Sequence, residues 1–370
     1  MKPKRKLCFD WGISDHYGWG IYGLNLLIYG SMNDSFEVIP IEPPSFLYPI
    51  DPLTVKFLSE KLPSPNTNIE LKNNDLFLSA LGNSNQSSVD NRFRNIGVIF
   101  SEVNPLPSNE IINLRKFEFI ISGSSWNASV LKDEKIIVHT VIQGIDLNLF
   151  QPAPKRYLND KFVIFSGGKL EYRKGQDILL KAFAKLASKY EDVVLITAWR
   201  SPWEGQFAGS INQSGICDPL QISDDMGKSI YEWILRNGVK SEQVICLEAM
   251  PNRLMPEVFR EVDLAVFPNR CEAGTNLVAM EALAYGLPCL ISKNTGHLDI
   301  IKADNCFPLT VQKQIHGHGM LGWGESSVDQ VVDLMEDAYH GRAQINRLKV
   351  RESMLNYSWD NAIRSMLVLL

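Results

Sequence analysis

Two glutamates stand on either side of a short polar turn in the stretch "CEAGTNLVAMEALAYGLP", which runs from Cys271 to Pro288. The small and hydroxyl residues of "AGTN" predict a helix start, with Thr275 or Asn276 as its cap. The free N–H groups of such a terminus suit a pyrophosphate. Glu281, near the second turn, can accept hydrogen bonds from ribose hydroxyls, and Glu272 can hold sugar hydroxyls. Local pairing of Glu281 and solvation of Glu272 are the alternatives.

A second candidate lies in "FVIFSGGKLEYRKGQDILLKAF", where Gly167 and Gly168 directly follow a predicted strand. Glycines let a ligand approach the backbone, and Lys169 and Lys174 bring positive charge close to a helix N-terminus, which attracts phosphate. The stretch is neither GxxxxGK[ST] nor GxGxxG. Alone it is also compatible with a solvated basic loop.

Short apolar runs alternate with longer amphipathic runs along the whole chain, which is typical of βα units and a parallel sheet. At 148–161 prolines and charges replace that pattern, so we interpret this stretch as an interdomain linker. The pattern predicts an α/β protein with two Rossmann-like β/α/β domains facing a central cleft. Ligands should bind at the carboxyl ends of the strands. The polar stretch 63–91 reads as a long loop around one poor strand.

The composition is that of an ordinary globular protein: 370 residues, 45% hydrophobic and 21% charged. This length favours two domains. A net charge of −5 argues against a nucleic-acid partner. Six scattered cysteines indicate reduced thiols and a cytoplasmic location, and no signal peptide or membrane-spanning run is visible. The basic "MKPKRK" start is compatible with solvation or with peripheral contact at the inner face of a membrane.

The two glycine-bearing stretches together resemble the retaining glycosyltransferases of family 4 (group 1), which have the GT-B fold. Further landmarks are "SSWNASVLKD", "VIQGIDLNLFQP" and "YSWDNAI". The resemblance implies that Lys169 and Lys174 neutralise the pyrophosphate of a nucleotide sugar, that Glu281 binds ribose and that Glu272 binds the donor sugar. Two departures stand out. Eight residues instead of seven separate the glutamates, and Lys169 replaces the commoner arginine.

The resemblance also implies a domain plan and roles in the first half. We expect an acceptor-side domain at 1–155, a nucleotide-sugar domain at 156–355 and a final helix at 356–370 that crosses back to the first domain. "DHYGWGIYGLNL" resembles the family's glycine-rich loop, so Gly18 and Gly20 would let this loop approach the donor phosphates and the acceptor. His16 could assist the acceptor hydroxyl or be structural. Glu102, where the family often has a histidine, could contact sugar or end a strand.

Two remaining candidates have plainer interpretations. Asp224 and Asp225 look like a metal-binding DxD without its spacer, and we interpret them as helix-capping residues, so no metal site is predicted. Thr295, Gly296 and His297 follow a strand and either contact the donor or form a simple turn.

The sequence therefore predicts a hexosyltransferase that uses a UDP or GDP sugar, retains the anomeric configuration and needs no metal or cofactor. The acceptor would be a hydroxyl of a glycan or glycolipid, as in polysaccharide or glycoconjugate biosynthesis. A non-catalytic sugar-nucleotide or glycan-binding partner in a polysaccharide assembly complex is the alternative, and a sugar-nucleotide epimerase is a weaker one. The predicted catalytic residues are Lys169, Lys174, Glu272 and His16. The predicted donor-binding residues are Gly18, Gly20, Gly168, Gly274, Thr275, Asn276, Leu277 and Glu281.

Overall fold

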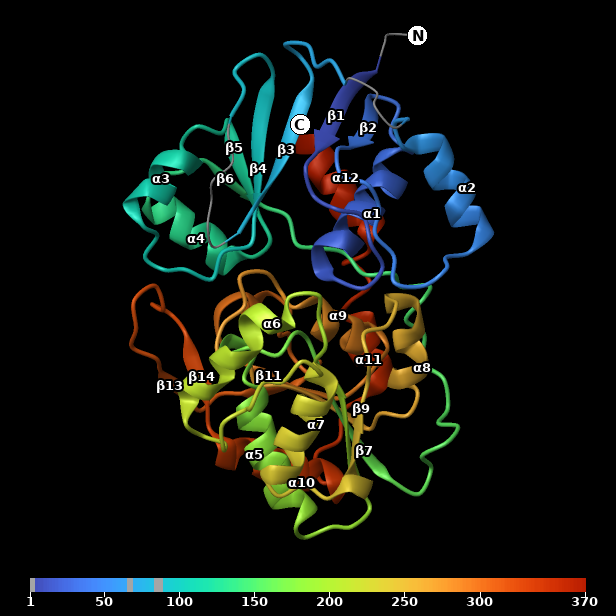
Figure 1. Ribbon diagram of the computed structural model, residues 1–370, viewed down its shortest axis with the longest axis vertical. Helices are drawn as coiled ribbons and strands as arrows, with labels where there is room; N and C mark the ends of the chain where they lie inside the picture. Colours follow the sequence, from blue (N-terminus) through green and yellow to red (C-terminus); the bar gives the residue numbers. More distant parts are fainter. Residues whose placement is uncertain (1–3, 65–68, 83–88) are drawn as a thin grey trace. The chain divides into compact units, whose positions relative to one another are not determined.

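A computed structural model describes residues 4–64, 69–82 and 89–370. Contacts divide the chain into two compact units (Figure 1). The first comprises the chain through Gly144 together with Tyr357–Leu370, and the second is Ile145–Asn356. The sequence suggested boundaries at 155/156 and 355/356.

The first unit is built on a six-stranded parallel sheet in the order β2-β1-β3-β4-β5-β6. Its strands are β1 Arg5–Phe9, β2 Phe36–Pro40, β3 Leu76–Leu81, β4 Arg94–Ile99, β5 Phe119–Ser122 and β6 Val138–Thr140. Its helices are α1 Gly18–Gly30, α2 Pro52–Lys61, α3 Ser108–Leu114, α4 Ser125–Asp133 and α12 Trp359–Leu369. The order reverses between β1 and β3, so the β1–α1 loop lies at a topological switch point.

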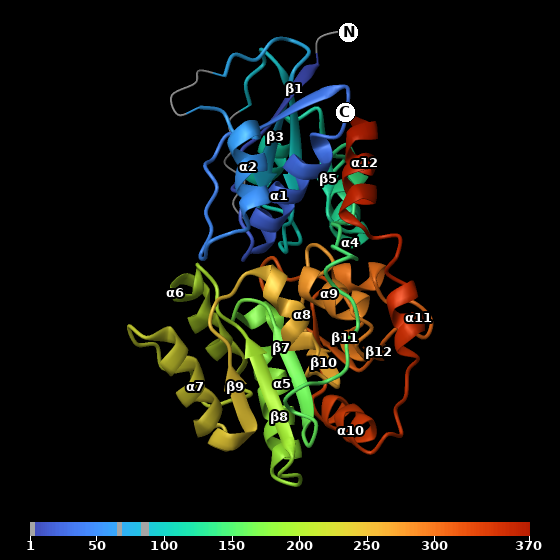
Figure 2. The same cartoon turned by 90° about the vertical axis from the view of Figure 1, so that its right-hand side faces the viewer.

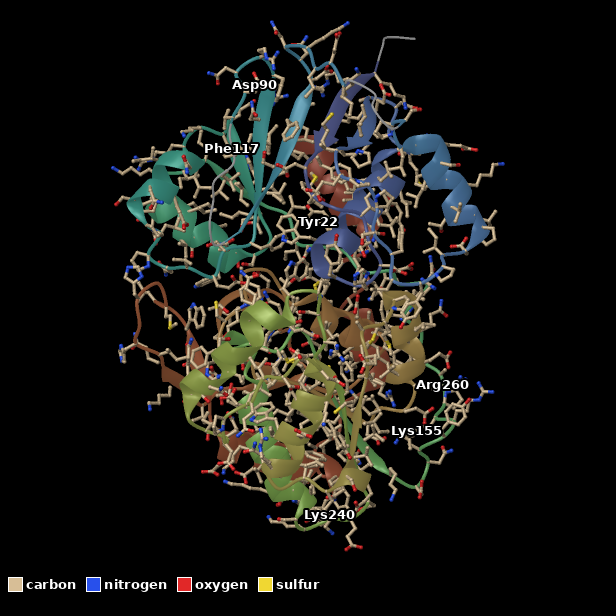
Figure 3. The ribbon with its side chains drawn as sticks, in the orientation of Figure 1. Tyr22, Asp90, Phe117, Lys155, Lys240 and Arg260 are labelled. Carbon is tan, nitrogen blue, oxygen red and sulfur yellow. The ribbon has the colours of Figure 1, made fainter. Side chains whose placement is uncertain are left out.

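Helix α12 packs against α1, although more than three hundred residues separate them in the sequence (Figure 1). Tyr22 of α1, labelled in Figure 3, stacks on Trp359 of α12 with ring centroids 5.5 Å apart, and both side chains are buried. A Cβ on Gly144 would lie 2.3 Å from the Trp359 Cα, so only glycine fits there. The last helix is therefore part of the first unit.

The second unit has a parallel sheet in the order β12-β11-β10-β7-β8-β9 (Figure 2). Its strands are β7 Phe162–Gly167, β8 Val193–Ala198, β9 Val244–Cys246, β10 Leu264–Phe267, β11 Cys289–Ser292 and β12 Phe307–Leu309. An antiparallel hairpin adds β13 Gln312–Gln314 and β14 Gly324–Ser326. The helices are α5 Gln176–Ala187, α6 Glu204–Phe207, α7 Met226–Arg236, α8 Met255–Phe259, α9 Leu277–Ala284, α10 Val328–Tyr339 and α11 Arg347–Glu352. The order has the Rossmann pattern, with its reversal between β7 and β10.

The inner strands of this sheet are buried on both faces, which explains their nearly continuous apolar sequences. Val163, Ile164 and Phe165 of β7 are fully buried, and α5 and α10 pack together beside the sheet. The segment before β7 is held to this unit by ion pairing and amide contacts. Lys155 pairs with Asp263, and Glu261 accepts hydrogen bonds from the amides of 156–158.

The predicted α/β class and the two Rossmann-like sheets are confirmed. Several elements escaped the sequence analysis, among them β2, α2 and the β13–β14 hairpin. The "poor strand" is β3, a central strand of the first sheet. All six cysteines are free thiols. Among the residues that the structure describes, no helix is long and apolar enough to cross a membrane.

Candidate active site

Two loops meet at the switch point of the second sheet, one after β7 and one after β10. The first contains two glycines with left-handed backbone, Gly168 at φ +108° and Gly175 at φ +69°. A Cβ on Gly175 would lie 2.1 Å from the carbonyl oxygen of Pro268, directly after β10. Glycine at this position therefore lets the two loops touch, which brings Lys174 close to Glu272.

A chain of alternating charges joins the two loops. Lys169 Nζ lies 3.2 Å from Glu171 Oε2, and Arg173 Nε lies 2.7 Å from Glu171 Oε1. Arg173 Nη1 then lies 3.0 Å from Glu272 Oε2, and Lys174 Nζ lies 2.5 Å from Glu272 Oε1. Three cations thus share two carboxylates, which leaves an excess of positive charge. Lys169 also lies over the ring of Phe207, with its Nζ 4.1 Å from the centroid.

Glu272 is held ionised at the centre of this chain. Burial alone would raise its pKa, but the charges of Lys174 and Arg173 outweigh that effect and hold the pKa at about 2. Asn269 also donates to Oε1. The Glu272 carboxylate is 6% exposed, so it is a fixed and almost dehydrated anion beside the cations.

The turn after β11 supports the backbone of Glu272. The Glu272 amide donates to Thr295 Oγ1 at 2.8 Å, and the Gly296 amide donates to the Glu272 carbonyl oxygen at 3.0 Å. A Cβ on Gly296 would lie 1.7 Å from the carbonyl oxygen of Gly274. The predicted turn at 295–297 is therefore a brace for the loop that carries Glu272.

Helix α9 begins where the sequence predicted, with Asn276 at the N-cap position, but the Asn276 side chain makes no capping hydrogen bond. Asn276 occupies the cap position with φ 65°, but its Nδ2 lies 3.2 Å from His297 Nε2. Thr275 Oγ1 instead contacts Met280 Sδ at 2.9 Å. The first amides of α9, beginning at Leu277, therefore have no side-chain acceptor from Asn276, and the positive end of the helix dipole is not neutralised there.

His297 is the partner that holds the Asn276 amide. Its Nδ1 lies 3.2 Å from the Ser292 carbonyl oxygen, which can only accept, so Nδ1 carries the proton. Burial lowers the pKa of His297 to about 4, against the raising effect of Glu272. The neutral ring therefore accepts from Asn276 Nδ2 at its Nε2.

Glu281 lies in a different environment from Glu272, although both belong to the same predicted constellation. It is buried within α9, and its Oε1 accepts from Asn252 Nδ2 at 2.7 Å. Burial raises its pKa to about 8, and the Asn252 hydrogen bond offsets only part of that effect. At neutral pH Glu281 is thus largely protonated and can both donate and accept.

The candidates of the first unit lie together after β1. His16 Nδ1 is 2.6 Å from Ser14 Oγ, its ring meets Tyr17 edge-on, and burial lowers its pKa. The predicted glycine-rich loop is in fact the first turn of α1, which contains Gly18 and Gly20. A Cβ on Gly20 would lie 2.3 Å from the Ser14 Cβ, so this glycine lets α1 pack on its own preceding loop.

Two other candidates have clear local surroundings. Asp225 is the N-cap of α7 and accepts from the Lys228 amide at 2.9 Å, which confirms its interpretation as a helix cap. Glu102 is buried just beyond β4. Within the described ranges, no group of three or more His, Cys, Asp or Glu side chains is arranged to hold a metal ion.

Sequence reasoning missed Glu171, Arg173, Asn252 and Asn269. Glu171 and Arg173 lie inside the quoted "KLEYRKG", but their significance depends on the pairing of Arg173 with Glu272, which is 99 residues away. The available signal was the crowding of four charged side chains of mixed sign into the six positions from 169 to 174. Nothing local marks Asn252 or Asn269.

Residues 150–349 match the family described as "Glycosyl transferases group 1". The chain belongs to this family. A D-inositol 3-phosphate glycosyltransferase of Catenulispora acidiphila is 28% identical over 175 residues, which are 45% of this chain and 38% of that protein. An uncharacterized glycosyltransferase of Methanocaldococcus jannaschii is 22% identical over 203 residues, 55% of this chain and 43% of that protein. The chain thus matches less than half the length of these curated relatives.

Solved structures of low identity share the fold over nearly the whole chain. A glycosyltransferase from Rickettsia africae has a TM-score of 0.65 at 11% identity and covers 99% of this chain and 97% of its own. Anabaena HepE in complex with UDP-glucose has a TM-score of 0.64 at 15% identity and covers 99% of this chain and 100% of its own. Sucrose-phosphate synthase from Thermosynechococcus elongatus has a TM-score of 0.65 at 14% identity and covers 99% of this chain and 98% of its own. These likenesses support the predicted GT-B fold.

Proposed function

We propose that this protein is a retaining glycosyltransferase that moves a hexose from a nucleotide diphosphate sugar to an acceptor hydroxyl. The observation that carries the proposal is the excess of cations on Lys169, Arg173 and Lys174 next to the uncapped N-terminus of α9. Both features lie at the switch point of a Rossmann-type sheet, where such folds bind nucleotides.

The chemistry of these residues suits a departing diphosphate. When the bond between the anomeric carbon and the β-phosphate oxygen breaks, negative charge grows on that oxygen. Lys174, Arg173 and the first amides of α9 would stabilise this charge in a site that is largely closed to water. The acceptor oxygen forms the new bond, and its proton passes to the β-phosphate oxygen. This route needs no protein base and no metal.

The two glutamates would then have separate tasks. Glu281, protonated or ionised, would hydrogen-bond the ribose hydroxyls. Glu272 would hold hydroxyls of the donor sugar while it keeps Lys174 and Arg173 in place. His16, with its ring hydrogen-bonded to Ser14, would act on the acceptor side.

The proposal extends to the donor and acceptor classes. Anabaena HepE is described with UDP-glucose, with UDP, and with UDP and glucose, which favours a UDP sugar over a GDP sugar here. The acceptor would be a hydroxyl of a glycan or glycolipid, and the reaction would take place in the cytoplasm. Membership of family 4 within group 1 is part of the same proposal.

Calorimetry on three single variants tests the pocket. Lys174→Ala and Glu281→Ala should each weaken binding of the preferred UDP or GDP sugar by about 10-fold or more, because each removes a buried partner of the ligand. Lys185→Ala is the matched control, since Lys185 also pairs with a carboxylate, Asp329, but is 47% exposed on the surface. If both site variants bind as tightly as the control, the pocket is misassigned.

The lengthened spacing between Glu272 and Glu281 favours the second candidate, a non-catalytic sugar-nucleotide-binding partner. Slow hydrolysis of the donor without acceptor separates the two candidates. An enzyme should release nucleoside diphosphate in proportion to time, and Lys174→Ala should abolish that release. A binding partner should release none.

A further inference from the structure

Arg270 is a fully buried arginine that stands two residues before Glu272. Its guanidinium forms a forked pair with Asp177 at the start of α5, with Nη1 to Oδ1 at 2.8 Å and Nη2 to Oδ2 at 2.6 Å. Both side chains are 0% exposed. No ligand can reach this guanidinium directly, so any effect of Arg270 on the site must pass through its neighbours.

The same guanidinium holds the segment that carries the site cations. Nη1 donates to the carbonyl oxygen of Tyr172 at 2.7 Å, and the guanidinium lies 4.2 Å from the centroid of the Tyr172 ring. The Arg270 backbone amide donates to the Arg173 carbonyl oxygen at 2.7 Å. Arg270 thus fixes two consecutive carbonyls, directly before Lys174.

The β13–β14 hairpin is attached to this arrangement from the other side. Glu325 of β14 accepts from Arg270 Nε at 3.0 Å, and the Gly324 amide donates to the Arg270 carbonyl oxygen at 3.0 Å. The rings of Trp323 and Tyr172 stack with centroids 6.4 Å apart. Asn294 Nδ2 also bridges the Asn269 and Gly324 carbonyl oxygens. The hairpin therefore contacts both loops of the site.

We propose that Arg270 and Glu325 are positioning residues for the diphosphate, and that the β13–β14 hairpin is a brace on which donor affinity depends. The inference rests on the proposed function. Asp177 and Glu325 neutralise Arg270, so Arg270 contributes geometry and not charge to the ligand. Lys174 and Arg173 point at Glu272 only while the backbone of Tyr172 and Arg173 stays fixed. The Arg270 side chain holds the Tyr172 carbonyl, and the Arg270 backbone amide holds the Arg173 carbonyl.

The test compares a nucleoside diphosphate with the monophosphate of the same base. Arg270→Lys keeps the positive charge but loses the forked hydrogen bonds. A positioning role predicts that this variant binds the diphosphate about 10-fold more weakly or worse. The affinity for the monophosphate, which lacks the second phosphate, should change less than about 3-fold. Glu325→Gln should lower the ratio of diphosphate affinity to monophosphate affinity as well, by a smaller factor. It provides a milder variant in case Arg270→Lys folds poorly.

Arg351→Lys is the matched control. Arg351 also clamps backbone carbonyls in the same unit, those of Phe150, Ala284 and Leu147, but it touches neither loop of the site. It should lower the melting temperature and leave the ratio of diphosphate to monophosphate affinity unchanged.

The outcomes separate the two proposals. If Lys174→Ala lowers diphosphate affinity but Arg270→Lys and Glu325→Gln leave the ratio as it is in the parent or in Arg351→Lys, the positioning role is overturned. If Lys174→Ala itself leaves diphosphate affinity unchanged, the proposed function fails, and the positioning role fails with it.

Discussion

The two glutamates of the site show how position alone sets the protonation of one residue type. Glu272 faces two cations and has a pKa of about 2, whereas Glu281 is buried beside the Asn252 amide and has a pKa of about 8. The carboxylate that orders the phosphate-binding cations is therefore always charged. The one assigned to ribose can both donate and accept, as a hydroxyl partner requires.

The raised pKa of Glu281 has a consequence for stability. An acid whose pKa is higher in the folded than in the unfolded protein makes folding less favourable as the pH rises through the interval between the two values, here from about 4.5 to about 8. Glu281→Gln removes this penalty and keeps an acceptor for Asn252. The variant should gain about 2–4 kcal/mol relative to the parent between pH 5 and pH 8.

Urea unfolding at both pH values measures that gain. The difference in unfolding free energy between variant and parent should become more favourable to the variant at the higher pH. A difference that stays constant from pH 5 to pH 8 would show that Glu281 ionises normally.

At the scale of elements, the site depends on loops that touch closely at the ends of β7 and β10. Gly175 and Gly215 both have left-handed backbone, at φ +69° and φ +64°, but only Gly175 is crowded. Nothing lies within 4 Å of a Cβ at Gly215. A comparison of these two glycines therefore distinguishes the cost of backbone strain from the cost of a steric clash.

Alanine at each glycine tests this contact. Gly215→Ala should cost about 1 kcal/mol of folding free energy from strain alone. Gly175→Ala should cost at least about 3 kcal/mol, because the Pro268 carbonyl must move as well. Denaturant midpoints measure both costs. Equal costs would mean that the two loops are not held in contact.

Most elements could be predicted from the sequence, because alternating apolar runs mark βα units wherever strands are buried on both faces. The strand predicted before Gly168 is β7, and the helix predicted to start at "AGTN" is α9, which begins at Leu277. Local chemistry was harder to predict. Asn276 has a good capping side chain, but His297 holds it away from α9, and no pattern around Asn276 signals that competition.

The ion pairs of the site were hard to predict for the same reason. The quoted loops contain Lys169, Lys174 and Glu272, and the sequence placed them in one site. It did not show that Glu171 and Arg173 connect them, because the pairing of Arg173 with Glu272, 99 residues away, depends on how two loops meet. Likewise, Gly18 and Gly20 suggested a loop, although together they begin a helix.

At the scale of the whole molecule, the chain leaves the first unit after Gly144 and returns to it at Tyr357. The stack of Trp359 on Tyr22 and the close approach of Gly144 to the Trp359 backbone tie the last helix to the first. The first unit therefore depends on the last residues of the sequence, whereas the proposed diphosphate site belongs to the second.

Trp359→Ala should separate the two units thermodynamically. Trp359 is 2% exposed, and truncation of such a side chain costs about 3–5 kcal/mol. In a thermal scan, the first unit should melt earlier, and the transition that nucleoside diphosphate stabilises should move little. If the diphosphate-stabilised transition falls equally, the units unfold as one and this division fails.

The most direct test of the account is a crystal structure with bound nucleoside diphosphate. We predict that the phosphates lie within hydrogen-bonding distance of Lys174 Nζ and of the first amides of α9, and that the ribose lies beside Glu281. Diphosphate bound elsewhere in the second unit, with Lys174 still paired only to Glu272, would contradict the central claim.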